Sequence, residues 1–473
     1  MGKPTGFLET PRVENPFRSE AGRLGDFLDL HSHLPQEQRR DQASRCMYCG
    51  VPFCQSDYGC PLHNLIPEWN DLLFRGQEKE ALARLLETAP FPEFTGRVCP
   101  ALCEKACNLA DRDGALTNRD NELYLIETGF AKGWIRPRVP AVRTGKRVAV
   151  IGSGPSGLGA ADFLNRQGHS VTVYEKADRP GGLLMYGIPN MKLPKEIVER
   201  RIRLMEAEGI TFRLNTPADP GLLDEYDALL LCGGARKPRA LNVQGAGAPG
   251  VFFAVDYLTA ATRGLVEGTE PSVSAAGRHV VVVGGGDTGN DCVGTALRQG
   301  CASVTQLEMM PAPPADRTLS NPWPEWPRVL RTDYGQLEAV SRQGADPRVY
   351  ETTVQEIIPD ESGAVQAIRT VRLERSADGR FIPVAGSEHT LPCGLLLIAA
   401  GFVGCEEKTL ETFSLAADAR GRLLPQDLSH RLGGKLFSAG DMRTGQSLVV
   451  RALADGRAAA KEVCAMLSGE CNC

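Results

Sequence analysis

Seven cysteines are gathered in one short part of the chain, between residues 46 and 107. They form two groups, one spaced Cys-x2-Cys-x4-Cys-x5-Cys and the other Cys-x3-Cys-x3-Cys. In a chain of ordinary globular composition, such a cluster of thiols indicates metal ligands rather than disulfides. The candidate metal ligands among the cysteines are Cys46, Cys49, Cys54, Cys60, Cys99, Cys103 and Cys107.

The number and spacing of these thiols favour iron–sulfur clusters over zinc. Structural zinc usually takes two Cys-x2-Cys pairs, and the chain has one such pair here, Cys46 and Cys49. Two four-iron clusters take four ligands each, so seven thiolates and one oxygen ligand would suit them. A zinc site and a set of reduced structural thiols remain the alternatives.

A glycine-rich turn follows a strongly apolar run at Val148–Ile151. The turn reads Gly152-x-Gly154-x-x-Gly157, an alanine-rich helical segment follows, and the next apolar run ends in Glu175. This strand–turn–helix–strand–acid order is typical of a dinucleotide site, in which the pyrophosphate faces the helix N-terminus and the acid accepts from a ribose. A tight turn without a ligand is the alternative.

The same pattern occurs a second time. Val280–Val283 predicts a strand, Gly284-x-Gly286-x-x-Gly289 opens a helix, and the following strand ends in Glu308. Two such units predict two dinucleotides, between which hydride can pass. One of the two must be a flavin, because a nicotinamide pair has no route to one-electron iron–sulfur carriers. The predicted nicotinamide contacts are Gly284, Gly286, Asp287, Thr288, Gly289 and Glu308.

The sequence favours NADH over NADPH as the nicotinamide. A carboxylate pairs with a free ribose 2′-hydroxyl, whereas a 2′-phosphate needs cations. Glu308 is followed by Met309 and Met310 rather than by arginines. Arginines at 317, 328 and 331 could still fold back towards the ribose, so NADPH remains open.

Three further segments extend the flavin site. A loop with Gly181 and Gly182 before Leu183 suits close backbone approach to a cofactor. A late apolar strand ends in Gly440-Asp441, and a helix then begins near Ser447. Its first amides would face the electron-rich edge of a flavin. The predicted FAD contacts are Gly152, Gly154, Pro155, Ser156, Gly157, Glu175, Lys176, Gly182, Leu183, Gly440, Asp441, Ser447 and Leu448.

Composition excludes several other classes of protein. The net charge is −5 with both signs mixed along the chain, which does not suggest nucleic acid or an anionic membrane as a partner. No apolar run approaches the length of a transmembrane helix, and residues 1–6 lack the apolar core of a signal peptide. We expect a cytoplasmic protein.

The segments around the cysteines also carry a resemblance. Residues 45–54, 59–70 and 91–103, together with the Gly-Gly-Leu-Leu loop, resemble the family of glutamate synthase small (β) subunits. The same N-terminal domain occurs in dihydropyrimidine dehydrogenase. The resemblance implies that one cluster takes Cys46, Cys49, Cys54 and Cys107, and that the other takes Cys60, Cys99, Cys103 and a downstream Gln or Glu.

The resemblance places the eighth ligand downstream of the cysteines. Glu122 is the position that matches best, but Thr117–Glu122 departs from the usual family sequence, and Glu127 is a second choice. A solvated helix carboxylate is the alternative reading of Glu122.

We therefore expect an α/β protein in which an α-helical iron–sulfur domain precedes two Rossmann-like dinucleotide-binding domains. The expected bounds are residues 1–145 for the helical domain, 146–276 and 401–473 for a split FAD domain, and 277–400 for an inserted NAD(P)H domain. Hydride transfer needs no acid–base pair, so we assign no catalytic residue.

The resemblance implies the electron-input subunit of glutamate synthase, with FAD, NADH or NADPH and two [4Fe-4S] clusters. Its partner would be a large (α) subunit in a hetero-oligomer. One alternative is a related subunit serving ferredoxin, sulfur or pyrimidine reduction. Another is a non-catalytic zinc scaffold with degenerate nucleotide folds.

Overall fold

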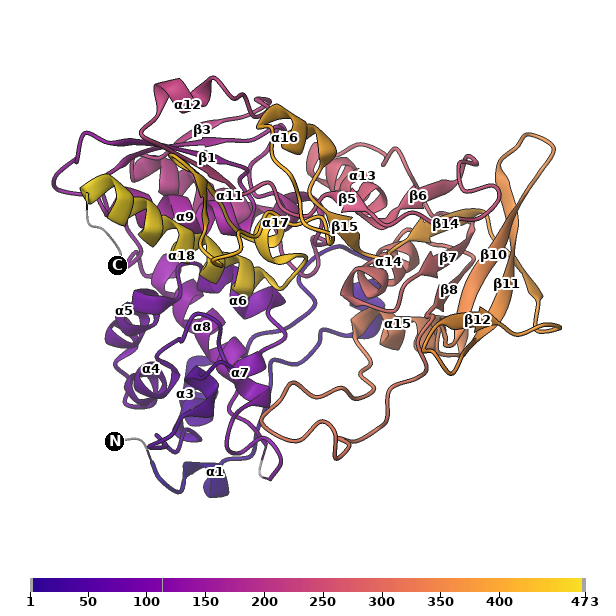
Figure 1. The fold of residues 1–473 in the computed structure, drawn as a ribbon. Coiled ribbons are helices and arrows are strands. Elements are labelled where there is room, and N and C mark those ends of the chain that lie inside the picture. The colour runs from indigo at the N-terminus through magenta and orange to yellow at the C-terminus, as the bar shows by residue number, and fades with distance from the viewer. Residues whose placement is uncertain (1–2, 113, 470–473) are drawn as a thin grey trace.

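The computed structural model describes residues 3–112 and 114–469 and has three parts (Figure 1). Residues up to about 135 form a helical part, which Figure 1 shows in violet below the first sheet. Its helices are α1 (Gly6–Glu9), α2 (Glu20–Leu24), α3 (Gln36–Ser44), η1 (Phe53–Gln55), α4 (Ile66–Phe74), α5 (Glu78–Thr88), α6 (Pro92–Val98), α7 (Leu102–Lys105) and α8 (Asn118–Ala131). The described residues include no helix long and apolar enough to cross a membrane.

The first sheet has the strand order β16-β17-β4-β1-β2-β3, and its strands are parallel except for the edge strand β16. The strands are β1 (Arg147–Ile151), β2 (Ser170–Tyr174), β3 (Thr211–Arg213), β4 (Ala228–Leu231), β16 (Arg431–Gly433) and β17 (Leu436–Ser438). Residues from both sides of the inserted part therefore pair in one sheet, as the split-domain prediction requires.

The helices of this part are α9 (Pro155–Arg166), α10 (Leu183–Tyr186), α11 (Lys195–Ala207), α12 (Leu222–Glu225), α16 (Glu407–Thr412), α17 (Asp441–Thr444) and α18 (Val449–Ser468). The last helix, α18, packs along α9 and also contacts α6 of the helical part. In Figure 1 it lies in yellow between the first sheet and the violet helices. It is thus the element that joins the two parts.

The second sheet is fully parallel, in the order β6-β14-β7-β8-β9. Its strands are β6 (Val251–Phe253), β7 (His279–Val283), β8 (Ser303–Leu307), β9 (Arg348–Val349) and β14 (Leu395–Ile398), and its helices are α13 (Ala254–Glu267), α14 (Asp287–Arg298) and α15 (Tyr334–Gln343). The predicted boundary at residue 276 is too late, because β6 pairs with β14 and α13 follows it directly. Residues 251–276 carry no glycine-turn signature, so no motif marks this strand.

Shorter strands complete the inserted part. An antiparallel meander, on the right of Figure 1, contains β10 (Thr352–Pro359), β11 (Val365–Arg375), β12 (Phe381–Pro383) and β13 (His389–Pro392). The chain leaves the part built on the first sheet at β5 (Lys237–Pro238) and returns to it at β15 (Phe402–Gly404). These two strands pair with each other. This two-stranded ribbon marks the junction of the inserted part.

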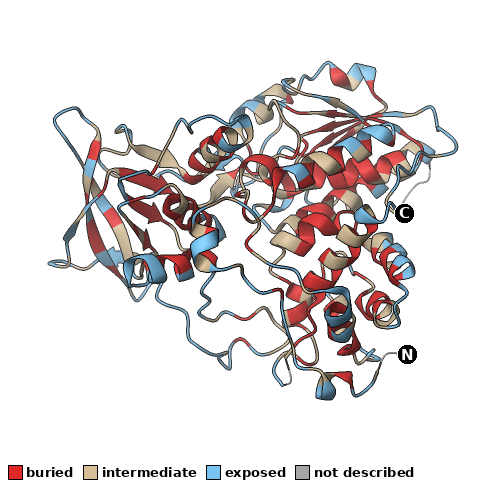
Figure 2. Ribbon diagram, turned by 180° about the vertical axis from the view of Figure 1, so that it is seen from behind, coloured by how far each residue is buried: buried red, intermediate tan, exposed pale blue. Residues whose placement is uncertain are grey.

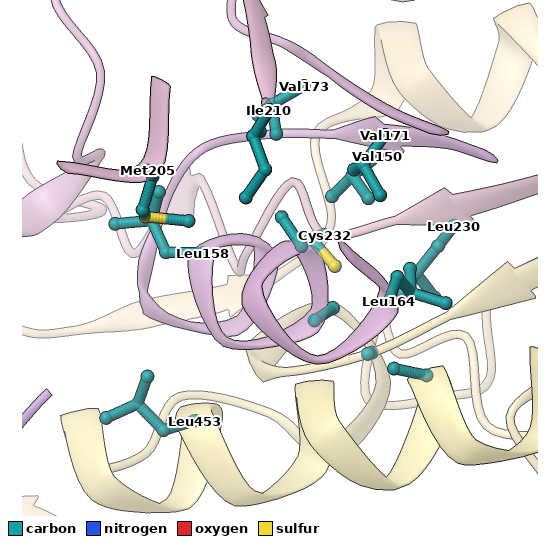
Figure 3. Packing of buried hydrophobic residues seen from close by; sticks show 14 of the residues in the cluster. Val150, Leu158, Leu164, Val171, Val173, Met205, Ile210, Leu230, Cys232 and Leu453 are labelled. Atoms are coloured by element: carbon teal, nitrogen blue, oxygen red, sulfur yellow. The ribbon is translucent and has the colours of Figure 1, made fainter. Parts of the chain in front are cut away.

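The buried residues concentrate in the two sheets and in the helices packed on them (Figure 2). In the part built on the first sheet, Val150 and Val173 from neighbouring strands pack against Leu158 of α9. Leu453 of α18 lies on the far side of that helix (Figure 3). Helices α9 and α18 approach closely at a glycine, because a Cβ on Gly456 of α18 would lie 2.2 Å from the Ser156 oxygen of α9. Continuous apolar runs are expected where both faces of a parallel sheet are covered.

The N-terminal arm crosses from the helical part to the inserted part. Arg23 Nε donates to Glu338 Oε1 of α15 at 3.0 Å, and Glu338 also pairs with Arg298 of α14. The Leu30 amide donates to the Met191 carbonyl, in the part built on the first sheet, at 3.1 Å. The arm therefore ties all three parts together through buried contacts.

Candidate cofactor sites

Four of the predicted thiols meet in one small cavity of the helical part. Its lining includes Cys46, Cys49, Cys54 and Cys107. Cys46 and Cys49 follow α3 and Cys54 lies in η1, whereas Cys107 follows α7 and is distant from them in sequence. The structure thus brings together the ligand set that the family resemblance implied for the first cluster.

The other predicted ligands line a second cavity. Cys60, Cys99 and Cys103 are gathered there with Glu122 of α8. Glu122 is 9% exposed, so the reading as a solvated helix carboxylate is wrong. Glu127 accepts from Arg97 and Arg200 at 2.8 Å and does not line this cavity.

Burial makes ionisation of these ligands unfavourable in the absence of a cation. It raises the pKa of Cys46 and Cys99 to about 12 and that of Cys60 to about 11. Burial likewise raises the pKa of Glu122 to about 8. Thiolates form at neutral pH in such places when metal ions supply positive charge. The donor set fits a group that carries several cations.

The arrangement does not suit a single ion. Across residues 3–112 and 114–469, no three His, Cys, Asp or Glu side chains are close enough to hold one metal ion. A four-iron cluster instead spreads its ligands around a larger body, with one thiolate for each iron. Two separate four-residue sets therefore favour clusters over a zinc centre.

The first glycine turn closes the carboxyl edge of the first sheet. Gly152 has φ +103°, and a Cβ there would lie 2.5 Å from the Cys232 carbonyl oxygen. A Cβ on Gly157 would lie 2.0 Å from the Gly152 oxygen, so helix α9 can pack this closely only with glycine. At Gly154 an added Cβ would meet no protein atom within 4 Å. This open side faces the cavity described next.

A cavity of about 430 Å³ lies over this turn. The Glu175 carboxylate borders it and accepts from the Ser153 amide at 3.1 Å and from the Ala177 amide at 2.9 Å. Asp441 accepts from Ser447 Oγ at 2.7 Å on another wall. The predicted FAD contacts that line this cavity are Gly152, Gly154, Pro155, Ser156, Glu175, Lys176, Gly182, Leu183, Asp441 and Ser447.

Three predicted FAD contacts do not line this cavity. Gly157 serves helix packing, and Gly440 lies against Ser156, whose Cβ would be 2.6 Å from a Cβ added to the glycine. Leu448 lines a neighbouring surface groove instead. Burial raises the pKa of Asp441. Hydroxyl groups that donate to this carboxylate would stabilise its charged form.

The second glycine turn borders a larger cavity of about 780 Å³. Gly286, Asp287 and Glu308 line it. The Glu308 carboxylate accepts from the amides of Gly285 and Met310, each at 2.8 Å. Gly284, Thr288 and Gly289 do not line it: a Cβ on Gly289 would lie 2.1 Å from the Gly284 oxygen, so these glycines close the turn.

The opposite wall of this cavity was not predicted. It includes His31 of the N-terminal arm, Arg97 and Cys99 of the helical part, and Lys192 of the part built on the first sheet. Arg331 also lines it, and its guanidinium lies 4.3 Å from the centroid of the Trp326 ring. The arm has little periodicity, and no motif links these positions. Of these residues, only Arg331 was named from the sequence as a cation that could reach the nicotinamide ribose.

Comparison with known proteins places this geometry in a family. The model for dihydropyrimidine dehydrogenase domain II, 4Fe-4S cluster, matches residues 23–134, and the model for pyridine nucleotide-disulphide oxidoreductases matches residues 146–326. The chain is 46% identical to the glutamate synthase [NADPH] small chain of Bacillus subtilis, over 99% of both proteins. This chain belongs to the glutamate synthase small-chain family.

Glutamate synthase relatives differ in size and in the nucleotide that they are named for. The glutamate synthase [NADH] of Schizosaccharomyces pombe is 45% identical over 98% of this chain, which spans 23% of that protein. The glutamate synthase [NADPH] small chain of Escherichia coli is 35% identical over 96% of this chain. Both nucleotides thus occur among relatives of the small chain.

Solved structures confirm the fold of the two dinucleotide-binding domains. FprA from Mycobacterium tuberculosis superposes with a TM-score of 0.52 at 22% identity, covering 69% of this chain and 87% of FprA. In this chain the helical iron–sulfur domain precedes the oxidoreductase fold, as the sequence predicted.

Proposed function

We propose that this chain is the electron-input subunit of a glutamate synthase. It oxidises NAD(P)H at FAD and passes electrons through two [4Fe-4S] clusters to a large subunit that makes glutamate from glutamine and 2-oxoglutarate. The observation that carries the proposal is the succession of one flavin-sized cavity and two four-ligand cavities along one path. FAD would accept hydride and release single electrons to iron.

The path begins at the N-terminus of α18. Val449 lines the flavin cavity, and the next residue, Val450, lines the cavity of Cys60, Cys99, Cys103 and Glu122. Ile66 and Asn118 line both cluster cavities. We therefore place the Glu122 cluster next to the flavin and the Cys46 cluster after it.

The large subunit would meet the chain near the second of these clusters. Tyr48 and Val51, which flank Cys49, are 42% and 69% exposed. Exposed apolar side chains beside an electron exit suit a protein partner. The Schizosaccharomyces pombe relative, of which this chain spans 23%, supports a large partner in the same assembly. We place this hetero-oligomer in the cytoplasm, where thiols stay reduced.

We assign the residues to the cofactors as follows. The FAD ribityl hydroxyls would meet Asp441, and the ribose of its adenosine would meet Glu175. Glycine turns at Gly154 and Gly286 would hold the two pyrophosphates at the starts of α9 and α14. The clusters would take Cys46, Cys49, Cys54, Cys107 and Cys60, Cys99, Cys103, Glu122.

NADH is the favoured nicotinamide in this proposal. Glu308 lines the cavity at the end of β8, where a carboxylate accepts from a free 2′-hydroxyl. Arg348 lies on the same wall, but its guanidinium donates to Asp346 at 2.7 Å and to the Arg331 carbonyl at 2.7 Å. Arg331 makes no ion pair among the described residues, and its guanidinium could serve a 2′-phosphate.

Anaerobic titration of the purified protein with NADH and with NADPH tests the proposal. NADH is expected to bleach the flavin band faster than NADPH does. Arg331→Met is expected to slow NADPH further while leaving NADH unchanged. Faster bleaching by NADPH in the wild type would overturn the assignment of Glu308. Absence of bleaching by either nucleotide would overturn the proposed function.

A further inference from the structure

His430 lies between two carboxylates of α18, outside every cavity described above. Its Nδ1 lies 2.6 Å from Glu462 Oε1, and its Nε2 lies 3.1 Å from Asp455 Oδ1. Its backbone amide also donates to Glu462 Oε2 at 2.9 Å. A ring that donates to a carboxylate on each side must carry both protons, so the geometry suits an imidazolium. The residue is 6% exposed.

Asp455 connects this histidine to the flavin site. Its Oδ2 accepts from the Gly440 amide at 2.7 Å, while its Oδ1 accepts from Arg443 Nη1 at 2.9 Å as well as from His430. Gly440 has φ +73° and ψ −151°, a conformation that L side chains rarely adopt. The hydrogen bond from its amide to Asp455 therefore fixes a turn that glycine alone adopts readily.

The turn presents the flavin contacts. Gly440 lies against Ser156 of the first glycine turn, and Asp441 follows it directly. Asp441 accepts from Ser447 Oγ, and Ser156, Asp441 and Ser447 all line the flavin cavity. Movement of Gly440 would displace Asp441 from this wall.

We propose that His430 is a positioning residue for FAD: through Asp455 it holds the Gly440–Asp441 turn, so that flavin affinity depends on the protonation of His430. This inference rests on the proposed function, because it takes the cavity over Gly154 to be the FAD site. FAD binding and protonation of His430 then favour each other, as thermodynamic linkage requires.

The charges around His430 fix the direction of the pH effect. Asp455 and Glu462 face it from α18, and Arg443 faces it from α17, with Asp427 near Arg443 and Asp441 near Asp455. Burial opposes the charged ring, but hydrogen bonds to Asp455 and Glu462 raise its pKa above the ordinary 6.5. The contribution of the imidazolium to FAD affinity is therefore complete below the pKa of His430 in the FAD-free chain, which lies above 6.5, and is lost as pH rises through the higher pKa of the FAD-bound chain.

Equilibrium binding of FAD to the deflavinated full chain across this pH range tests the proposal, with flavin fluorescence as the readout. The wild-type dissociation constant is expected to rise roughly tenfold for each unit by which bound FAD raises the pKa of His430. His430→Gln should bind roughly tenfold more weakly at the acidic end. The dissociation constant of this variant for FAD should also lack the pH dependence that the wild type shows. His169→Gln is the matched control, because His169 is also 6% exposed but bonds to Thr144, away from the turn.

A second variant covers the case in which His430→Gln does not fold. Glu462→Gln keeps an acceptor for the ring but removes one negative charge, so the midpoint of the pH curve should move to lower pH. Wild-type affinity and an unchanged pH curve in both variants would overturn the inference. If the wild type binds no FAD at any pH, the proposed function fails instead, so the two failures are distinct.

Discussion

Glu122 is the residue at which family resemblance and local sequence disagreed. The family resemblance implied three thiols of one ligand set, but the proposed fourth ligand lies on α8 within a run that departs from the family pattern. The structure puts Glu122 in the cavity of those thiols and puts Glu127 in ion pairs with Arg97 and Arg200. Helix α8 places these two carboxylates five residues apart, on different sides, which favours Glu122 as the proposed ligand.

Replacement of Glu122 tests this assignment. Glu122→Ala is expected to lower the iron and acid-labile sulfide of the anaerobically purified protein from two clusters to one, because only three ligands remain. Glu122→Gln should keep both clusters, since an amide oxygen can replace the carboxylate oxygen. Glu127→Gln is the matched control and should keep both as well. Full iron content in Glu122→Ala would contradict the assignment.

The glycines of the first turn have two separable tasks. A Cβ at Gly157 would collide with the Gly152 oxygen, whereas a Cβ at Gly154 would meet no protein atom within 4 Å. Gly154 has φ −66° and ψ −179°, which alanine adopts without strain. Gly157 therefore serves the fold, and Gly154 leaves space for the ligand.

Alanine substitutions should separate these tasks. Gly154→Ala is expected to keep the wild-type circular dichroism spectrum and the thermal midpoint of the flavin-free protein, but to lose most bound FAD, because its methyl group occupies the pyrophosphate position. Gly157→Ala should lower the thermal midpoint of the flavin-free protein itself. Wild-type FAD content in Gly154→Ala would show that the open side of this glycine does not face the cofactor.

At the scale of elements, a buried lysine holds the loop that contains α10. Lys195, at the start of α11, donates to the carbonyls of Leu184 at 2.9 Å and Ile188 at 2.6 Å. Burial lowers its pKa from 10.5 to about 7. In the unfolded chain the amine binds a proton up to a higher pH than in the folded chain. Folding stability therefore rises with pH between about 7 and 10 through this group.

Lys195→Met removes this titration. The wild type is expected to gain stability relative to the variant by up to about 1.4 kcal/mol for each pH unit above neutrality. Thermal midpoints of both proteins, measured by circular dichroism at several pH values, provide the check. Lys79→Met, at an exposed site on α5, controls for the loss of a lysine charge. A difference between wild type and Lys195→Met that stays constant with pH would contradict the role of burial.

The sequence predicted the elements that carry strong local patterns. Apolar runs before each glycine turn became β1 and β7, and the helices after them became α9 and α14. Ile197, Val198 and Ile202 are buried on one side of α11. Strand β6 has three residues and lies between segments without turn motifs, so only its pairing with β14 reveals it.

At the scale of the whole molecule, the walls of the larger cavity could not be predicted. Residues of the N-terminal arm, the helical part and the second glycine turn meet there because Arg23 pairs with Glu338 and Leu30 pairs with Met191. Each of these contacts spans more than a hundred residues of sequence, and none has a local pattern. The ligand types were visible in the sequence, whereas the neighbours that surround them required the fold.

In the proposed function, hydride enters this chain at one cavity and electrons leave it singly through iron. Protein produced and purified without oxygen, with iron, sulfide and FAD supplied, provides the most direct test when it is mixed with NADH. We predict one FAD and two four-iron clusters per chain, with bleaching of the flavin band followed by the electron paramagnetic resonance signal of a reduced cluster. Protein that holds zinc alone, or that remains colourless under these conditions, would contradict the account.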